Sequence, residues 1–403
     1  MLRYQNWGLI VAGVALTVPT AALAASLRLN VQSQSLQVQR LSVHQPSVRR
    51  NVGLQKVLST ADGGQIFGWD INRNGTDGVL ASSQDVGSGQ VKVSVETFDQ
   101  KTAKITKSFA QSTGTRNSYS ATGIFSSDIG LVTHFIEPKP FHVLRRYEVM
   151  NPVTGGKFTS TLHLPTSLIV EQNGVNQSTA TSLLYATTKS GTPELLTLDL
   201  ATGTLVKTIH LDPNLFNGNN GTQVDQNSVT NQAVLASSPS FGAVGGGPPL
   251  IATIDLATGK VVKFNGLNAG TFGSGFVNGL AVDSNTNIAA TTTELNAQVE
   301  FYNLKTQVGV GIQLPNTGST SQAFSGVEVA SDPVNKLFFI GQPLSSQTQS
   351  GSTIYVYHED GTLLETLNGF NFGGAGNRIA VNPATRTGFV NGPGPDQLQQ
   401  FTY

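Results

Sequence analysis

Apolar and polar residues alternate in short runs along most of this chain, and turn-forming residues separate the runs. Residues 250–256, LIATIDL, form one such run, whose alternation is typical of a partly buried β-strand. The following ATGK favours a tight reversal, because Gly259 can adopt a positive φ and because Asp255 and Thr258 can bond the nearby backbone. A second run, VVKF, begins directly afterwards. The pattern therefore predicts a β-hairpin.

The same hairpin signature recurs along the sequence. TLDLATGTLVKTIHL at 197–211 matches TIDLATGKVVKFNGL at 253–267. Weaker copies lie at 95–109, 145–164, 299–314 and 354–370, and a truncated copy lies at 398–403. The residues before the seven turns are spaced by 49, 51, 56, 48, 55 and 44 residues; they are Phe98, Tyr147, Leu198, Ile254, Tyr302, Tyr357 and Phe401. A period near fifty residues predicts a repeat architecture.

A second pattern of strand, turn and strand precedes most of these hairpins. It is found at 66–83, 122–136, 278–293, 325–341 and 377–392. Each repeat therefore predicts four antiparallel strands, which make one blade of a β-propeller. Helical periodicity is missing after residue 25, and this excludes a helical solenoid.

We predict an all-β, seven-bladed β-propeller of four-stranded antiparallel blades over residues 52–403. The last repeat ends after its third strand, and residues 52–60, VGLQKVLST, have no partner in their own repeat. We expect this N-terminal strand to complete the last blade and close the ring, which would remove exposed sheet edges.

The IDLATGK motif with its alternating flanks resembles the repeat of the quinoprotein-dehydrogenase-like propellers, especially the group with the Tyr-Val-Thr-Asn-type motif. The resemblance covers about residues 52–403. In quinone-binding members of that family the motif continues to a tryptophan that docks one blade on the next. This chain has Lys207 and Lys263 at these places, and only two tryptophans, Trp7 and Trp69. We therefore expect no cofactor.

The first 51 residues differ from the rest. Residues 1–24 combine Arg3, an apolar stretch and small residues near Ala24, a pattern typical of a secretory signal peptide that is cleaved before Ala25. Its apolar run is about eleven residues, shorter than the roughly twenty that a membrane-spanning helix needs. Residues 25–51 are a polar arm rich in Gln and Ser. The pattern predicts a secreted or periplasmic protein without a membrane span after cleavage.

Charge and cysteine content restrict the partners. Asp, Glu, Lys and Arg make up 12% of the chain, and loss of Arg3 with the leader leaves 23 basic against 24 acidic residues, a net charge of −1. Such a chain has no electrostatic attraction for nucleic acid. The zero cysteine count excludes disulfides and thiolate metal sites. We expect a monomer.

The histidines do not suggest a metal or acid–base centre. In a propeller the first strand of each blade lines the central channel, and none of the six histidines lies on a predicted first strand. They are His44, His134, His142, His163, His210 and His358. The sequence also has no nucleophile elbow, phosphate-binding loop or zinc-type spacing. We expect no catalytic residue and no metal.

A few residues near the predicted axis are candidates for ligand binding. Glu328 lies on a first strand and Arg378 begins the next one, so the two side chains would pair across a blade interface. The other candidates are Asp225, Asp70 and Trp69. Asp283 and Asp332 lie at predicted hairpin turns, where a structural role is sufficient.

Two functions remain open. The first is a non-catalytic binding or scaffold module that contacts a protein or glycan through the polar loops of one face, at 213–222, 241–249 and 342–352. The alternative is a propeller enzyme with an axial site, either a small-substrate hydrolase such as a lactonase or a degenerate quinoprotein-type dehydrogenase. Propellers host unrelated activities, so the fold alone does not decide between them.

Overall fold

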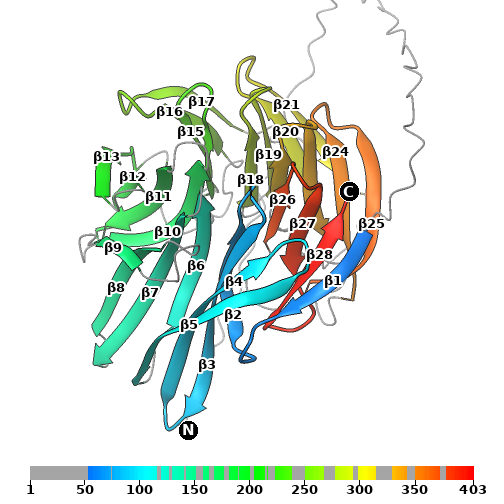
Figure 1. The fold of residues 1–403 in the computed structure, drawn as a ribbon. Coiled ribbons are helices and arrows are strands. Elements are labelled where there is room, and N and C mark those ends of the chain that lie inside the picture. The colour runs from blue at the N-terminus through cyan, green and yellow to red at the C-terminus, as the bar shows by residue number, and fades with distance from the viewer. Residues whose placement is uncertain are drawn as a thin grey trace, which may run out of the picture. The chain divides into compact units, whose positions relative to one another are not determined.

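The computed structural model describes residues 53–403 except for residues in the connections between strands. These exceptions are 74, 116–118, 127–128, 140–141, 151–157, 163–167, 177–180, 189, 200–203, 214–215, 217–222, 238–249, 267–276, 294–297, 315–328, 343–349 and 373–377. The signal peptide and the polar arm predicted for residues 1–51 lie outside the described residues. Within the described ranges the chain forms 28 β-strands, which are arranged in four-stranded antiparallel sheets (Figure 1).

The strands of the first four sheets follow one another in the sequence. Sheet 1 consists of β2 (Gln65–Ile71), β3 (Asp77–Gly87), β4 (Gln90–Asp99) and β5 (Lys104–Thr115). Sheet 2 consists of β6 (Tyr119–Ser126), β7 (Ile129–Lys139), β8 (His142–Met150) and β9 (Phe158–Leu162). Sheet 3 consists of β10 (Leu168–Asn176), β11 (Thr181–Thr188), β12 (Pro193–Asp199) and β13 (Thr204–His210). Sheet 4 consists of β14 (Gln223–Asn227), β15 (Gln232–Ser237), β16 (Leu250–Asp255) and β17 (Val261–Gly266).

The last three sheets complete the set. Sheet 5 consists of β18 (Val277–Asp283), β19 (Ile288–Thr293), β20 (Gln298–Asn303) and β21 (Val308–Gln313). Sheet 6 consists of β22 (Val329–Asp332), β23 (Leu337–Gln342), β24 (Ser350–His358) and β25 (Leu363–Asn371). Sheet 7 consists of β26 (Ile379–Asn382), β27 (Thr387–Asn391), β28 (Gln397–Thr402) and β1 (Gly53–Ser59).

The two ends of the described chain meet in sheet 7. β1 pairs antiparallel with β28, with Gly53 opposite Thr402 and Ser59 opposite Gln397. This is the pairing that the sequence predicts for VGLQKVLST. In Figure 1, β1 and β28 lie side by side although almost the whole chain separates them. The pairing covers the edge that β28 would otherwise expose.

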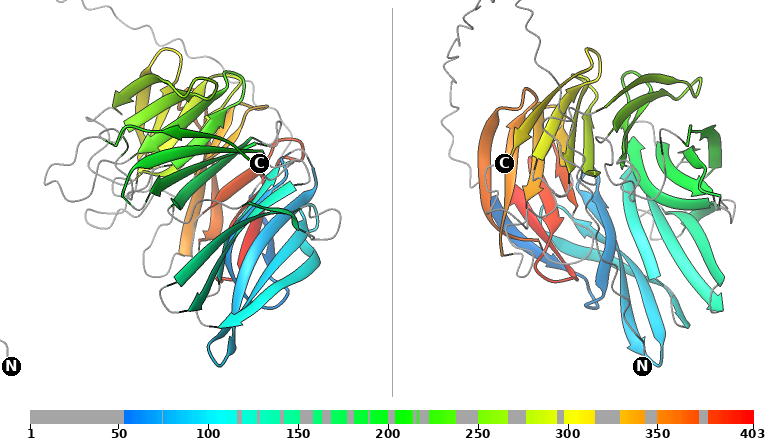
Figure 2. Two further views of the ribbon diagram at one scale, coloured as in Figure 1. Left: turned by 90° about the vertical axis from the view of Figure 1, so that its left-hand side faces the viewer. Right: turned by 180° about the vertical axis from the view of Figure 1, so that it is seen from behind.

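Contacts between the first strands connect the sheets in a cycle. They run β2–β6–β10–β14–β18–β22–β26 and return to β2, so the sheets follow one another around a common centre (Figure 2). This arrangement is an all-β propeller. The apolar cores lie between neighbouring sheets: one cluster joins Tyr185 of sheet 3 to Ala252 of sheet 4, and another joins Phe301 of sheet 5 to Phe338 of sheet 6.

The ring is less regular than the sequence repeat predicts. In sheets 4 to 7 each first strand contacts the first two strands of the preceding sheet, whereas β6 contacts β2, β3 and β4. Sheets 1 and 2 therefore overlap more than their neighbours do. The strands of these sheets are also among the longest, and β5 spans twelve residues. The prediction of a seven-bladed ring is corrected here: seven four-stranded sheets form, but sheets 1 and 2 overlap too far to stand as two separate blades.

The DLATG motif forms the predicted hairpin turn. Both the backbone NH and the hydroxyl of Thr258 donate to Asp255 Oδ1, at 2.7 and 3.0 Å, and Gly259 N donates to Asp255 O at 2.8 Å. Gly259 has a φ of +77°. The turn at Asp99 uses the same bonds with Thr102, at 2.6 Å each. The aspartate is therefore a turn residue, as the sequence predicts.

Lysines on fourth strands tie each of these turns to the neighbouring sheet. Lys207 Nζ of β13 donates to Leu256 O and Ala257 O in the turn of sheet 4, at 3.0 and 2.6 Å. Lys263 of β17 makes the same contact with the turn of sheet 5. Lys56 of β1 donates to Lys101 O in the turn of sheet 1, at 2.8 Å. These lysines occupy the interface where the resembling family places a docking tryptophan.

Candidate functional site

The candidate site lies where the first strands of sheets 1, 4 and 7 approach the centre. Arg378, which precedes β26, donates from Nη2 to Asp70 Oδ2 at 3.2 Å and from Nη1 to the carbonyl of Trp69 at 2.8 Å. The side chain of Asp70 is 4% exposed and that of Arg378 is 24% exposed. The structure therefore brings together three of the five predicted residues in one bridge between sheets 7 and 1.

The predicted pairing of Arg378 with Glu328 involves a residue outside the described ranges, and the partner that the structure describes for Arg378 is Asp70. Arg378 pairs with Asp70, because closure of the ring places the start of β26 against β2. The strand predicted around Glu328 begins at Val329, and Glu328 itself lies outside the described residues. The expected pairing of Arg378 with Glu328 therefore stays a prediction, while the position of Arg378 at a sheet interface agrees with the sequence analysis.

Trp69 is part of the packing between sheets 1 and 7. Its side chain is 1% exposed, and Nε1 donates to Asn391 Oδ1 at 3.1 Å. The same oxygen accepts the backbone NH of Arg378 at 2.9 Å. A buried indole whose NH already has an acceptor inside the protein is a structural contact, not a stacking platform for a ligand.

Asp225 links sheets 4 and 5. Its Oδ1 accepts the NH of Gln226 and its Oδ2 accepts the NH of Val282, each at 2.8 Å. Burial raises the pKa of the Asp225 carboxyl, while the charges of Arg73 and Arg378 act in the opposite direction. One oxygen of this carboxylate therefore bonds within its own strand, and the other links sheet 4 to sheet 5.

Arg73 is a member of the site that sequence reasoning missed. It lies two residues after the end of β2, and its positive charge acts on Asp225 of sheet 4 and on Tyr403 of sheet 7. Among the described residues the centre thus contains two arginines, Arg73 and Arg378, and two aspartates, Asp70 and Asp225. The sequence feature that could have indicated Arg73 was its position in WDINRNG, two residues after the first strand of sheet 1.

The two predicted turn aspartates have the predicted role. Asp283 Oδ1 accepts the backbone NH groups of Asn285 and Thr286, at 2.8 and 3.3 Å. Asp332 Oδ1 accepts those of Val334 and Asn335, at 3.0 Å each. Each carboxylate therefore fixes the turn that follows its own strand.

The described histidines lie away from the centre. His210 is on the fourth strand of sheet 3 and its Nδ1 is 3.1 Å from Glu194 Oε1; His358 ends β24. His134 and His142 lie on β7 and β8, a second and a third strand as predicted, while His44 and His163 lie outside the described residues. Within the described ranges no three side chains of His, Asp or Glu form a group that could hold a metal ion.

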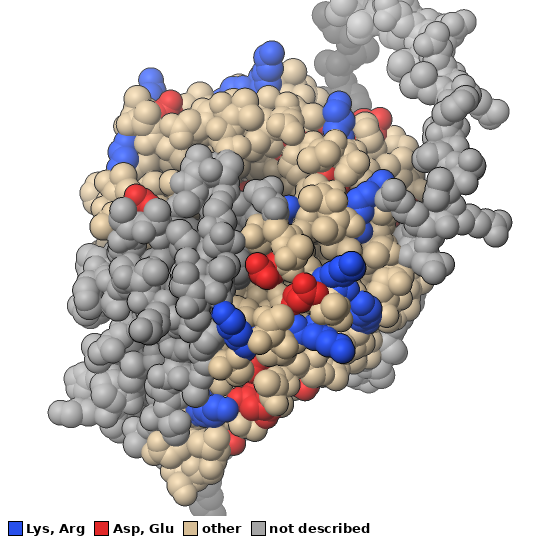
Figure 3. Space-filling model, viewed as in Figure 1, with Lys and Arg blue, Asp and Glu red and all other residues tan. Residues whose placement is uncertain are grey.

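Charged side chains are sparse on the face drawn in Figure 3, where most described atoms belong to uncharged residues and the blue and red side chains are scattered. This agrees with the 12% of charged residues in the sequence. No helix among the described residues has the length and apolar character needed to cross a membrane.

No family of proteins described by a sequence model matches this chain, and no curated protein sequence is similar to it. Among solved structures, the chain is similar to Raptor of Chaetomium thermophilum, with a TM-score of 0.58 and 12% identity over 87% of this chain and 29% of that one. It is similar to a chain of hydrazine synthase of Kuenenia stuttgartiensis, with a TM-score of 0.56 and 12% identity over 90% of this chain and 99% of that one. It is also similar to the Cps50 (Swd1) β-propeller domain of Myceliophteria thermophila, with a TM-score of 0.53 and 12% identity over 87% of this chain and 99% of that one.

These similarities concern the fold. This chain has the β-propeller fold. Identities of 12% carry no statement about a shared ligand or reaction, and the chain spans 29% of the Raptor chain that it matches. The quinoprotein-type resemblance of the DLATG repeat is a finer prediction than these similarities support.

Proposed function

We propose that this propeller is a secreted or periplasmic, non-catalytic binding module for a protein partner. The observation that carries the proposal is the use of the axial carboxylates. Asp70 accepts Ile71 N at 2.8 Å and Arg378 Nη2 at 3.2 Å, and Asp225 accepts two backbone NH groups at 2.8 Å. All four oxygens are therefore engaged inside the protein. General acid–base catalysis needs a carboxyl that reaches a substrate proton instead.

The proposed contact surface is one face of the ring. In an antiparallel four-stranded sheet, the connection from the second to the third strand and the connection to the next sheet leave from the same face. The three predicted recognition loops are connections of these two kinds: 213–222 precedes β14, 241–249 precedes β16 and 342–352 precedes or begins β24. Most of their residues lie outside the described ranges, and their sequences contain no Asp, Glu, Lys or Arg.

An uncharged surface favours recognition by shape and by neutral hydrogen bonds. Affinity for such a surface depends weakly on salt, because few ion pairs are screened. The propeller fold itself is compatible with this function and with others, since the similar chains include Raptor and a chain of hydrazine synthase.

The proposed location outside the cytoplasm is supported by the leader pattern of residues 1–24. Amino-terminal sequencing of the protein from its native host is expected to start at Ala25 or within a few residues of it. Recovery of the intact leader in a membrane fraction would contradict export with cleavage.

The binding proposal is tested by affinity capture from native extract with the mature protein as bait, followed by mass spectrometry of captured proteins and of any bound small molecule. Two matched variants identify the face. In the first, residues 343–349 are replaced by seven Gly and Ser residues; in the second, the exposed Val229 and Val334 on the opposite, short-turn face become Ser.

The partner is expected to be lost with the first variant and kept with the second, and its affinity is expected to change little between low and high salt. If the partner were lost with the second variant alone, the binding surface would lie on the opposite face, and the proposed face would be wrong. If the protein carried a stoichiometric cofactor and turned over a substrate, and if Asp225→Asn abolished that activity, the protein would be an enzyme with an axial site and not a binding module. Capture of glycan in place of protein would keep the face and correct the partner.

A further inference from the structure

One side-chain position recurs at the interfaces between sheets. The residue that ends a first strand faces the residue that directly follows the third strand of the next sheet. Asn382 ends β26, and its Nδ2 donates to Oε1 of Gln100, the residue after β4, at 2.9 Å. Asp332 ends β22, and its Oδ2 accepts the hydroxyl of Tyr403, the residue after β28, at 3.0 Å. Each pair joins two sheets by one hydrogen bond.

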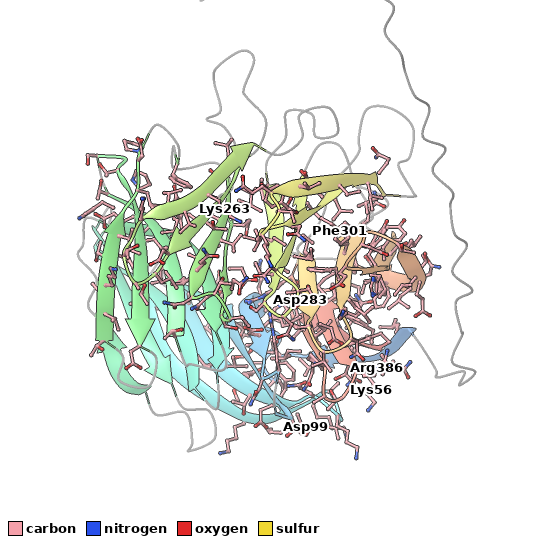
Figure 4. All side chains as sticks on the ribbon, turned by 90° about the horizontal axis from the view of Figure 1, so that it is seen from above. Lys56, Asp99, Lys263, Asp283, Phe301 and Arg386 are labelled. Carbon is pink, nitrogen blue, oxygen red and sulfur yellow. The ribbon has the colours of Figure 1, made fainter. Side chains whose placement is uncertain are left out.

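The equivalent pair between sheets 5 and 6 is Asp283 and Glu359. Asp283 ends β18 and Glu359 follows β24, so the two residues occupy the positions of Asn382 and Gln100. Two carboxyl groups thus stand where the other interface has two amides. Figure 4 shows Asp283 toward the middle of the ring, away from the labelled rim residue Lys263.

The free oxygens of this pair have no donor. Asp283 is fully buried; its Oδ1 accepts Asn285 N at 2.8 Å and Thr286 N at 3.3 Å, but its Oδ2 has no hydrogen-bond partner. Glu359 Oε1 lies 3.5 Å from Lys336 Nζ, and its Oε2 is buried without a partner. A buried carboxylate oxygen without a donor is strongly unfavourable, and two carboxylates at equivalent positions of one interface repel when both are charged.

The surrounding charges do not offset the cost of holding two negative carboxylates at this interface. Burial raises the pKa of Asp283, and the negative charge of Glu359 raises it further, although bonds from Asn285 and Thr286 lower it. Lys336 is the cation that pairs with Glu359, and its side chain is 54% exposed. The other charged groups nearby are already paired: they are His358 with Asp360, Asp332 with Tyr403, and Asp225 with the NH of Val282.

We infer that Asp283 keeps its proton to a higher pH in the folded protein than in the unfolded chain and donates it to Glu359, reproducing the hydrogen bond that Asn382 donates to Gln100. The pair is a pH-sensitive latch between sheets 5 and 6. No proton acceptor outside the pair is needed, because the proton remains on Asp283 and the negative charge remains on Glu359, beside Lys336.

The latch has a definite direction. Because the folded state holds a proton that the unfolded chain releases, the stability contributed by Asp283 is present below the ordinary pKa of Asp and is lost as pH rises through the folded pKa. Sheets 5 and 6 are therefore held together best in acid, and the interface weakens when Asp283 becomes charged.

The test compares Asp283→Asn with the unchanged protein by urea unfolding from pH 5 to pH 9. The amide of Asp283→Asn carries the hydrogen of the bond at every pH, as Asn382 does. The folding equilibrium constant of the unchanged protein is expected to fall relative to that of Asp283→Asn as pH rises, by about tenfold for each pH unit between the ordinary Asp pKa and the folded pKa, and to level off above the folded pKa. A carboxylic-acid carbonyl band in the infrared spectrum of the unchanged protein is expected to be missing in Asp283→Asn.

Glu359→Gln is the second variant, since it keeps an acceptor for Asp283 but removes the neighbouring charge and is expected to flatten the same pH dependence. Asp332→Asn is the matched control: the hydroxyl of Tyr403 loses its carboxylate acceptor, so stability is expected to fall by a similar factor at every pH. Parallel pH profiles for the unchanged protein and Asp283→Asn would overturn the inference. Stabilisation of the unchanged protein by calcium that Asp283→Asn abolishes would also overturn it, by showing a cation in place of the proton.

Discussion

Lys263 Nζ on β17 lies 2.8 Å from the carbonyl oxygen of Lys305, in the hairpin turn of the next sheet. The ammonium also contacts the carbonyl of Leu304, so one side chain satisfies two backbone acceptors at a turn whose strands belong to another sheet. Lys207 repeats this contact one sheet earlier. A cation that contacts carbonyl oxygens thus takes the place that an aromatic ring occupies in the resembling propeller repeat.

We expect Lys263→Met to lower the free energy of unfolding by about 1–2 kcal/mol, because hydrogen bonds from a charged donor to backbone carbonyls are lost while the aliphatic stem is retained. Lys260→Met, at an exposed position of the turn before β17, is the matched control and is expected to change stability by less than about 0.5 kcal/mol. Urea unfolding measures both. Equal losses would mean that Lys263 contributes through charge in general and not through the turn.

We expect Arg378→Ala to destabilise the protein by about 2–4 kcal/mol, because Asp70 is left buried without its cation. Arg378→Lys is expected to recover only part of the loss, since one ammonium cannot reproduce the two-branched contact with Asp70 and the carbonyl of Trp69. Thermal unfolding distinguishes the two variants. If partner binding were lost while stability stayed unchanged, the arginine would belong to a recognition site and not to the interface.

Deletion of residues 52–60 removes β1 and leaves β28 with an unpaired edge. We expect this variant to lose much of the stability of the ring and to aggregate, because the exposed strand edge can pair with another molecule. Deletion of residues 26–45 is expected to leave the melting temperature nearly unchanged. Circular dichroism melting and size-exclusion chromatography compare the two truncations, and similar behaviour of both would contradict the role of β1 in closing the ring.

We expect the fold to persist between pH 7 and pH 4. Bonds from Thr102 and Thr258 lower the pKa values of Asp99 and Asp255, so the stability that these groups contribute above the ordinary Asp pKa of about 3.9 is lost only at lower pH. Burial raises the pKa values of Asp225 and Glu96, so these groups bind protons more readily in the folded state and stability increases as they protonate.

The low charge content limits repulsion in acid as well, since the chain carries 24 Lys and Arg residues in total. Circular dichroism at a series of pH values is the measurement. Loss of the β-sheet signal between pH 4 and pH 5 would contradict this prediction.

The sequence by itself determined the local elements of this protein. Asp255, Thr258 and Gly259 specify a hairpin turn through bonds among neighbouring residues and a positive φ, and none of these effects needs a distant partner. Repetition of that turn at a period near fifty residues was sufficient to predict an all-β propeller of four-stranded sheets. The absence of a C-terminal fourth strand also indicated the pairing of β1 with β28.

Only the tertiary structure decided which residues meet at the interfaces and at the centre. Arg378 pairs with Asp70, 308 residues away in the sequence, and Lys56 docks on a turn of sheet 1, because the cycle of first strands brings sheets 7 and 1 together. The burial of Asp283 and the equivalent positions of Asp283 and Glu359 at one interface are equally invisible in the sequence, where both resemble ordinary turn residues. Local patterns fix a strand and its turns, whereas the identity of a neighbour across an interface depends on register and on curvature that arise when the whole ring packs.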